Sequence, residues 1–443
     1  MAGPLHSHGN RYPPGVQHEH ASPWLHHGLL RLVGALLVAG VIAGGTLVLT
    51  RRIAKSPAEP PRREAIRVDC RDGAACALAE EVALDVWSER RALGEPIDVV
   101  VDAAALAELA AGGARWTVLD PDIDATAGAE AARLRAHVLA DGGDWFAEFR
   151  DYTAIEAHIE ELAAMAPSRA SVHGIGSTLD GRTLWALRIG GQSPDALPML
   201  INGAQHAREW ISAMSATCIA DRLVRDYDSD PRIRSFVDST EAWIVPVVNP
   251  DGYQYSWGQD RYWRKNRRGG YGVDLNRNFS VAWGGAGSSA LKRSQVYRGD
   301  RPFSENESAA LRALAKREGI RAHVDLHAYG QLLLFPWNHG EQPTDDHARF
   351  AGIGDEMASA IYAQHKNGYR LLRGVELYPA AGTMNDWMYG ELGATSFTIE
   401  LRPRSGSGFV LPPAEIKPTC DEALAAVLAL RASRHLRDVG DSP

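Results

Sequence analysis

Residues 198–210 read PMLINGAQHAREW, a short β-type run that leads into two candidate metal ligands. A run typical of a helix follows, from Ile211 to about Tyr227. His206 and Glu209 stand three residues apart, so one turn can offer a nitrogen and a carboxylate oxygen to the same borderline-soft cation, such as zinc. Alone, the His-x-x-Glu pair is weak, because any histidine near any glutamate satisfies it. Its meaning depends on the residues downstream.

Length and composition bound the fold class. The 443 residues are enough for one large domain and a smaller one. Apolar and charged fractions of 45% and 23% are ordinary for a globular protein. The net charge of −8 gives no basic footprint, so we expect no nucleic-acid partner.

Four cysteines are too few for a disulfide scaffold. Cys70 and Cys76 are close enough in sequence to pair, and whether they do is left open. Cys218 and Cys420 lie in predicted helices and are expected to be small core residues.

The N-terminal part divides into three segments. Residues 1–28 are rich in His, Pro and Gly and are expected to be a disordered tail. Residues 29–50 are apolar apart from Arg31 and have the length of a membrane span, with a cleaved signal peptide as the rival reading. Residues 51–64 are a charged, Pro-containing linker. Its basic residues would keep that side cytoplasmic, whereas the chemistry inferred below favours an extracytoplasmic location.

Residues 65–125 predict a small α+β domain. Strands are expected at 65–70, 85–88, 96–101 and 116–119, and helices at 74–84 and 103–111, with Asp102 as an N-cap. This β-α-β-β-α-β order is the ferredoxin-like unit. Residues 126–144 are expected to connect it, partly as a helix, to a larger domain at 145–443.

The larger domain predicts an α/β fold with a mixed, mostly buried sheet flanked by helices. A helix is expected at 152–164 and a turn at 178–182. Short β-type runs occur at 172–175, 184–189, 199–201, 242–248, 322–326, 332–335 and 396–400.

A third metal ligand is expected at His327, which ends a strand-like run. Side chains at strand ends face the crevice where ligands bind. His323 lies on the same face but about 13 Å away at 3.3 Å per residue, so we assign it a structural role. His206, Glu209 and His327 would form a two-His, one-Glu set that leaves the fourth zinc position open for water, as a catalytic zinc site requires.

Further polar groups could complete a catalytic site. Glu400 ends another apolar strand, where a carboxylate is costly unless it has a task or a partner; the alternative is a salt bridge to Arg402. Arg264 lies in a dense basic loop. Asn276 and Arg277 place an amide beside a guanidinium, a pair that can hold a carboxylate. Tyr378 lies on a small-residue loop that can move over a substrate.

Motifs between residues 206 and 402 carry a likeness to a known family. They are HAREW (206–210), VNPDGY (248–253), WRKN (263–266), VDLNRN (273–278), HAY (327–329), Tyr378 with Asp386-Trp387, and FTIELR (397–402). In order and spacing they resemble the zinc metallocarboxypeptidases of the carboxypeptidase A/B type. The resemblance covers residues 145–435 and, more weakly, 65–125, which are similar to the family's inhibitory prodomain.

The resemblance implies a role for each residue. His206, Glu209 and His327 bind one Zn²⁺ per chain. Glu400 is the general base, and Arg264 polarises the scissile carbonyl and stabilises the oxyanion. The substrate-binding residues that the resemblance implies are Asn276, Arg277, Tyr378, Arg208, Tyr329 and Asn385. The enzyme would act as a monomer on peptide or protein C-termini. It would be made as a zymogen, and cleavage near Arg133 or Arg135 would release the active domain.

Two departures from the family pattern are visible. Asn385 matches the base of the specificity pocket, where an apolar residue suits apolar C-terminal residues and an acid suits Lys or Arg. With Arg373 also near the pocket, we expect a preference for polar or acidic C-terminal residues. A cysteine pair that many animal members carry is absent, so we expect the large domain to hold by packing alone.

Two other functions remain open from the sequence. One is a zinc amidase acting on cell-wall peptides or acylated amino acids, against which Asn276, Arg277 and Arg264 favour ordinary peptide C-termini. The other is a non-catalytic binding protein tethered to the membrane, which has no need for Glu400.

Overall fold

The computed structural model of the chain describes residues 61–71, 73–88, 94–138, 143–406 and 408–436. The expected tail at 1–28, the candidate span at 29–50 and most of the linker at 51–64 lie outside these ranges. Within the described ranges, no helix combines the length and the apolar character needed to cross a bilayer.

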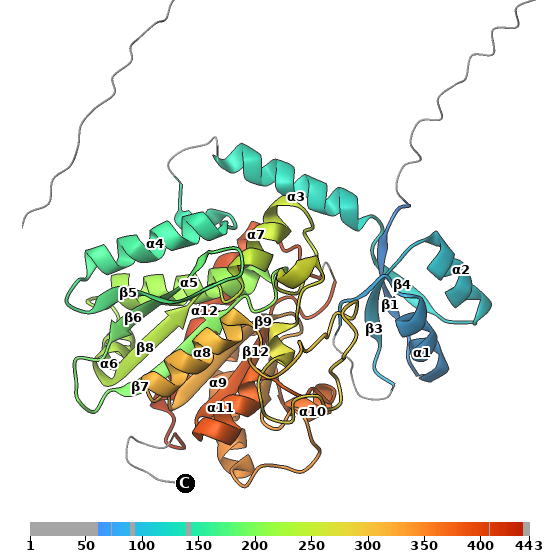
Figure 1. Cartoon of the computed structure of the whole chain (residues 1–443). Helices are drawn as coiled ribbons and strands as arrows, with labels where there is room; N and C mark the ends of the chain where they lie inside the picture. The colour runs from blue at the N-terminus through green and yellow to red at the C-terminus, as the bar shows by residue number, and fades with distance from the viewer. Residues whose placement is uncertain (1–60, 72, 89–93, 139–142, 407, 437–443) are drawn as a thin grey trace, which may run out of the picture. The chain divides into compact units, whose positions relative to one another are not determined.

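The first part of the described chain is a four-stranded antiparallel sheet with two helices, called here the four-stranded unit (Figure 1). Its elements are β1 (Glu64–Val68), α1 (Gly73–Val82), β2 (Asp85–Val86), β3 (Ile97–Val101), α2 (Ala103–Ala111) and β4 (Trp116–Asp120). The strand order is β2-β3-β1-β4, and the predicted β-α-β-β-α-β sequence is confirmed. Asp102 caps α2 by accepting from the backbone N–H groups of Ala104 and Ala105.

Helix α3 (Ile123–Val138) follows, and the rest of the chain forms the eight-stranded unit. Its strands are β5 (Ala170–Ser177), β6 (Thr183–Gly190), β7 (Leu197–Gly203), β8 (Thr240–Val245), β9 (Ala322–Ala328), β10 (Leu332–Phe335), β11 (Arg370–Arg373) and β12 (Thr395–Leu401). Its helices are α4 (Tyr152–Met165), α5 (Trp210–Arg225), α6 (Pro231–Ser239), α7 (Pro250–Gly258), α8 (Asn306–Arg317), α9 (His347–His365), α10 (Gly374–Leu377), α11 (Met384–Leu392) and α12 (Ile416–Ala432).

The large sheet is mixed, with the order β11-β10-β12-β9-β7-β8-β6-β5. Strands β12, β9, β7 and β8 run parallel to one another. On one side β6 pairs antiparallel with both β8 and β5, and on the other β10 pairs antiparallel with β12 and parallel with β11. The predicted α/β fold with a mixed, buried sheet is confirmed. Strand β11, with two arginines around two leucines, gave no β-type signal in the sequence.

Side chains from both faces of the sheet are buried. Met199 and Ile201 of β7 belong to the core cluster that also contains residues of α4, α5, α9 and α12. Leu200, between them, belongs to the cluster that contains residues of α8 and α11. Successive strand residues point to opposite faces, so helices cover the sheet on both sides (Figure 1).

The strand register brings the expected site residues to one edge. Glu400 of β12 lies opposite His327 of β9, and Gly203 at the end of β7 lies opposite Leu326. Because these strands are parallel, their carboxyl ends meet at the same edge, where ligands bind in open α/β sheets.

Disulfides are the one clear departure from the predicted core. Cys218 on α5 and Cys420 on α12 form a disulfide across a sequence separation of 202 residues, and Cys70 pairs with Cys76. The expectation that the large domain holds by packing alone is therefore wrong. Both helical cysteines are buried as predicted, but their pairing depends on the tertiary contact of two distant helices.

Candidate active site

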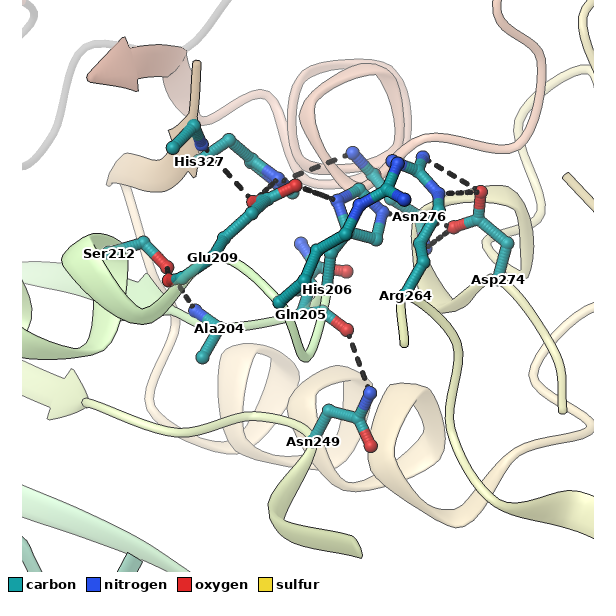
Figure 2. A network of polar contacts seen from close by, with 12 residues as sticks. Ala204, Gln205, His206, Glu209, Ser212, Asn249, Arg264, Asp274, Asn276 and His327 are labelled. Carbon is teal, nitrogen blue, oxygen red and sulfur yellow. Dashed lines mark hydrogen bonds and ion pairs between the residues drawn. The ribbon is translucent and has the colours of Figure 1, made fainter. Parts of the chain in front are cut away.

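The turn after β7 holds the first two candidate ligands in a fixed geometry. Ala204 adopts a left-handed backbone conformation with φ of 50°, which is rare for a residue other than glycine. The Ser212 hydroxyl accepts from the Ala204 N–H at 2.9 Å and donates to the Glu209 carbonyl at 2.7 Å. Asn249 donates to the Gln205 carbonyl at 3.1 Å (Figure 2). Hydrogen bonds with Ser212 and Asn249 thus hold the strained turn in place.

His206, Glu209 and His327 meet at the carboxyl edge of the sheet. One possible ligand atom from each lies within 4.8 Å of the others, and all three residues are buried. Glu209 Oε1 is 2.8 Å from His206 Nδ1, and Oε2 is 3.1 Å from His327 Nδ1. Figure 2 shows the Glu209 carboxylate beside the two imidazole rings.

The donor set fits zinc. The two Nδ1 atoms face each other at 3.1 Å in a buried site, an arrangement that a shared cation satisfies. Two imidazoles and one carboxylate are the ligand types of catalytic zinc sites. Burial opposes ionisation of Glu209, but the electrostatic interactions and hydrogen bonds with His206 and His327 outweigh it and lower the pKa of the carboxyl, so this candidate ligand is anionic.

Two buried aspartates orient the imidazoles from behind. Asp274 Oδ1 lies 3.1 Å from His206 Nε2, and Asp325 Oδ2 lies 3.0 Å from His327 Nε2. Such carboxylates fix the tautomer and the ring orientation of a ligating histidine. The sequence patterns did not predict a role for either aspartate. A carboxylate inside an apolar strand that ends in a histidine, or one just before Leu-Asn-Arg, is the signal that indicates them.

Burial would raise the pKa of Asp274, but Arg264, Arg277 and His206 hold it well below its usual range. Asp325 is held by amides: Asn202 and Gln205 each donate to it at 2.7 Å. His323 contacts Asn202 Oδ1 at 2.8 Å and the Ser396 hydroxyl at 2.7 Å. Burial lowers the pKa of His323 to about 4, so it is neutral and structural, as predicted.

Glu400 lies at the end of β12, almost buried, at a small cavity. The cavity measures about 20 Å³ and is lined by Asn276, Arg277, Tyr378 and Glu400, among others. Arg402, the alternative partner, instead donates to Glu415 and to both oxygens of Glu422.

The expected carboxylate-binding groups lie together at this cavity. The Met384 N–H donates to Asn276 Oδ1 at 2.9 Å, which leaves the amide Nδ2 facing His327 Nε2 at 3.4 Å. Arg277 donates from Nε to the Gly287 carbonyl and from Nη2 to the Tyr378 hydroxyl, both at 2.9 Å. Arg264 donates from Nη2 to Asp274 Oδ2 at 3.0 Å (Figure 2).

Asn385 is buried, and its amide orientation is fixed. Its Nδ2 lies 3.3 Å from the Leu334 carbonyl and 3.3 Å from Thr398 Oγ1. A carbonyl only accepts, so Nδ2 is the donor there. Its Oδ1 has no hydrogen-bond partner among the described residues. Arg373, expected near the pocket, donates instead to the Glu341 carbonyl at 2.5 Å and pairs with Glu376.

Arg208 and Tyr329 contact the four-stranded unit. Arg208 Nη1 donates to Asp85 Oδ2 at 2.6 Å, and only 1% of its surface is exposed. The Tyr329 hydroxyl donates to Asp98 Oδ2 at 2.8 Å. A second cavity, of about 380 Å³, is lined by Arg264, Arg277 and Tyr378 from one side and by Glu80, Val86, Ser88 and Ile97 of the four-stranded unit.

Comparisons with known proteins agree with this geometry. A family model described as zinc carboxypeptidase (Peptidase_M14) matches residues 155–426. Carboxypeptidase B of Rattus norvegicus is 32% identical over 304 residues, covering 67% of this chain and 73% of its own. Carboxypeptidase A4 of Mus musculus is 30% identical over 376 residues, covering 81% of this chain and 89% of its own.

Solved structures are similar over a longer span. The crystal structure of thrombin activatable fibrinolysis inhibitor matches with a TM-score of 0.77 at 27% identity, covering 84% of this chain and 98% of that one. Carboxypeptidase A from Helicoverpa armigera matches with a TM-score of 0.75 at 27% identity, covering 84% and 97%. Coverage of 84% extends beyond the eight-stranded unit into the residues before it.

Proposed function

The chain belongs to the zinc carboxypeptidase family, and from that premise we propose how its own residues remove a C-terminal amino acid. It is a metallocarboxypeptidase, a hydrolase that uses one zinc ion and acts on the C-terminal ends of peptides. His206, Glu209 and His327 would hold the zinc ion, which would supply Lewis-acid activation of the scissile carbonyl and of a water molecule.

The observation that carries the proposal is the cavity beside the ligand cluster. It places the Glu400 carboxylate next to Asn276, Arg277 and Tyr378. The terminal carboxylate of a peptide, held there by the Arg277 guanidinium and the Asn276 amide, would bring its last peptide bond between Glu400 and the metal ligands. Tyr378, which already contacts Arg277, would close over the bound residue.

In the reaction, Glu400 takes a proton from the attacking water and then gives it to the nitrogen of the leaving amino acid. The carbon–oxygen bond forms as the carbonyl becomes an oxyanion, and the carbon–nitrogen bond then breaks. Arg264 donates to the oxyanion, and Asp274 holds its guanidinium in place meanwhile. Glu400→Gln should retain zinc and substrate binding but lose turnover; turnover close to wild type would refute the role of Glu400.

We also propose that residues 65–125 are an inhibitory prodomain and that residues 126–144 carry the activation site. Contacts of Asp85 with Arg208 and of Asp98 with Tyr329 support this, because both partners belong to the expected substrate-binding set. Within α3, Arg135 is exposed, whereas Arg133 donates to Glu148 at 2.7 Å. Arg135 is therefore the more accessible cleavage position.

Limited trypsin on the zinc-loaded full chain tests the prodomain. Activity that rises as the chain is cut after Arg133 or Arg135 supports it. Activity that stays flat or falls while the N-terminal part is released refutes it.

For the cellular location, we propose an extracytoplasmic catalytic domain, either secreted or anchored through residues 29–50. Two disulfides support an oxidising compartment, since disulfides persist there and are rare in the cytosol. We further propose that the enzyme acts as a monomer, because one chain supplies every group named above.

A further inference from the structure

Strand β9 carries three polar side chains on one buried face. His323, Asp325 and His327 stand at every second position of the strand, and none of them is more than 1% exposed. Only His327 belongs to the candidate metal cluster. His323 lies about 13 Å away along the strand at 3.3 Å per residue, so it cannot bind the same ion. A polar ring in the middle of a buried sheet is costly unless its nitrogens are hydrogen-bonded.

Hydrogen bonds join His323 to His327 by way of the neighbouring strand β7. His323 Nε2 lies 2.8 Å from Asn202 Oδ1, and Asn202 Nδ2 donates to Asp325 Oδ1 at 2.7 Å. Asp325 Oδ2 lies 3.0 Å from His327 Nε2. The strand register places Asn202 directly opposite Asp325. These four residues, called here the β9 network, therefore connect the interior of the sheet to a candidate metal ligand.

The direction of each hydrogen bond in the β9 network is fixed. An ionised carboxylate only accepts, so Asn202 turns Nδ2 toward Asp325 and Oδ1 toward His323. The amide oxygen also only accepts, so His323 carries a proton on Nε2. His323 Nδ1 then accepts from the Ser396 hydroxyl of β12, which lies 2.7 Å away. Burial lowers the pKa of His323 to about 4, in keeping with a neutral ring that has one donor and one acceptor.

His323 keeps the Asn202 amide in the orientation that Asp325 needs. Among the described residues, His323 is the donor that Asn202 Oδ1 receives. An amide released from His323 can turn, and Asp325 then keeps only the Gln205 amide, which donates to Oδ2 at 2.7 Å. Hydrogen bonds in a buried row polarise one another, and the partner behind a ligating histidine sets the orientation of its ring. A change at His323 should therefore be felt at His327.

We propose that His323 is a positioning residue for His327 and acts through Asn202 and Asp325. It holds the Asn202 amide, the amide holds the Asp325 carboxylate, and the carboxylate keeps His327 Nδ1 directed at Glu209, 3.1 Å away. This inference rests on the proposed role of His327 in binding zinc. It gives a role at the metal centre to a residue that does not contact the ion.

The test measures the zinc affinity of the full chain by competition with a chromogenic chelator. His323→Phe keeps a ring but removes the donor, and zinc affinity should fall by about 3–10-fold, less than the 10–100-fold usual for losing the direct partner of a ligand. His323→Gln can still donate to Asn202 and accept from Ser396, so it should retain most of the affinity. The matched control is His158→Phe on α4, which removes another buried histidine 3.0 Å from an aspartate, Asp221, and should leave zinc affinity unchanged.

A double variant separates positioning from a merely structural role. In Asp325→Asn the link to His327 is already altered, so adding His323→Phe should lower zinc affinity little further. Asn202→Ala interrupts the same network by a smaller change and should lower zinc affinity as well, which keeps the test decisive if His323→Phe does not fold. Denaturant midpoints of the zinc-free proteins are measured alongside. A lower midpoint with unchanged zinc affinity in His323→Phe and Asn202→Ala, or fully additive losses of affinity in the double variant, overturns the proposal.

His327→Ala distinguishes this inference from the assignment on which it rests. An unchanged zinc affinity in His327→Ala would overturn the role of His327 as a ligand, and the positioning role of His323 with it. A large loss of affinity in His327→Ala, with none in His323→Phe or Asn202→Ala, would overturn the positioning role alone. Neither outcome depends on turnover, so the proposed carboxypeptidase function is tested separately.

Discussion

Asp274 Oδ1 lies 3.1 Å from His206 Nε2, while Oδ2 of the same carboxylate accepts from Arg264 Nη2 at 3.0 Å. One buried aspartate thus contacts both a candidate metal ligand and the arginine that we propose stabilises the oxyanion (Figure 2). The carboxylate is ionised, because the nearby positive charges outweigh the effect of burial on its pKa. We therefore propose that the candidate metal centre and Arg264 are coupled through a single side chain.

The first prediction concerns this coupling. Asp274→Asn keeps the shape but removes the charge, so His206 loses its anionic partner. Zinc affinity should fall by 10–100-fold, the usual cost of losing such a partner. Competition with a chromogenic chelator measures it. Asp230→Asn, a surface change at the N-terminus of α6, is the control, and an unchanged zinc affinity in Asp274→Asn would contradict the coupling.

The second prediction concerns inhibition by the four-stranded unit. Asp85→Asn leaves the buried Arg208 without its ion pair, and losing one partner of such a pair costs about 2–5 kcal/mol. The uncut chain should therefore show higher basal peptidase activity than the unaltered uncut chain. Asp69→Asn, which breaks an exposed pair with Arg71 in the same unit, should leave basal activity unchanged. Equal basal activities of all three chains would show that the Asp85 contact does not restrain the enzyme.

The third prediction concerns the C-terminal residue of the substrate. Asn385 Oδ1, an acceptor, has no hydrogen-bond partner in the part of the chain that the structure describes, and its Nδ2 is already engaged. The sequence predicted a preference for polar or acidic C-terminal residues, and the acidic part depended on Arg373. Because Arg373 is engaged by Glu341 and Glu376, we now expect no preference for acidic residues. Peptides ending in Gln or Asn should be cleaved faster than those ending in Glu or Asp, by roughly tenfold, since an acceptor facing a carboxylate stays unpaired.

The Gln/Glu pair isolates this effect because the two side chains have the same size. Asn385→Asp should shift the preference toward Lys, with its cationic end. Faster cleavage of Glu than of Gln by the unaltered enzyme would show that another group faces the substrate side chain.

The fourth prediction concerns stability. The Cys218–Cys420 disulfide closes a loop of about 200 residues, for which chain entropy gives about 5 kcal/mol of stabilisation. The double variant Cys218→Ser, Cys420→Ser should lower the denaturant midpoint of the eight-stranded unit accordingly. Cys70→Ser with Cys76→Ser, which opens a short loop, should affect only the four-stranded unit. An unchanged denaturant midpoint in the Cys218→Ser, Cys420→Ser variant would show that packing alone stabilises the eight-stranded unit.

The sequence predicted the cluster of His206, Glu209 and His327 because its signal is local. His206 and Glu209 lie in one turn, and His327 and Glu400 end strand-like runs, so alternation and strand ends were enough to place them. The β-α-β-β-α-β order was predicted because its strands and helices are short, periodic and separated by turn residues.

The features that the sequence did not predict depend on contacts between residues far apart in the chain. Asp274 meets His206 across 68 positions, and Arg208 meets Asp85 across 123. The cysteine pairing of α5 with α12 depends on how those helices pack. None of these contacts leaves a periodic trace in the sequence, so composition and spacing could not distinguish a buried core cysteine from a paired one.

The most direct measurement is a peptide-release assay on the trypsin-cut, zinc-loaded full chain. Peptides with varied C-terminal residues are followed by mass spectrometry, with and without a zinc chelator. The account predicts stepwise loss of single C-terminal residues, abolished by the chelator and restored by zinc. Folded, zinc-loaded protein that releases no C-terminal residue, or that cleaves only internal bonds, would contradict it.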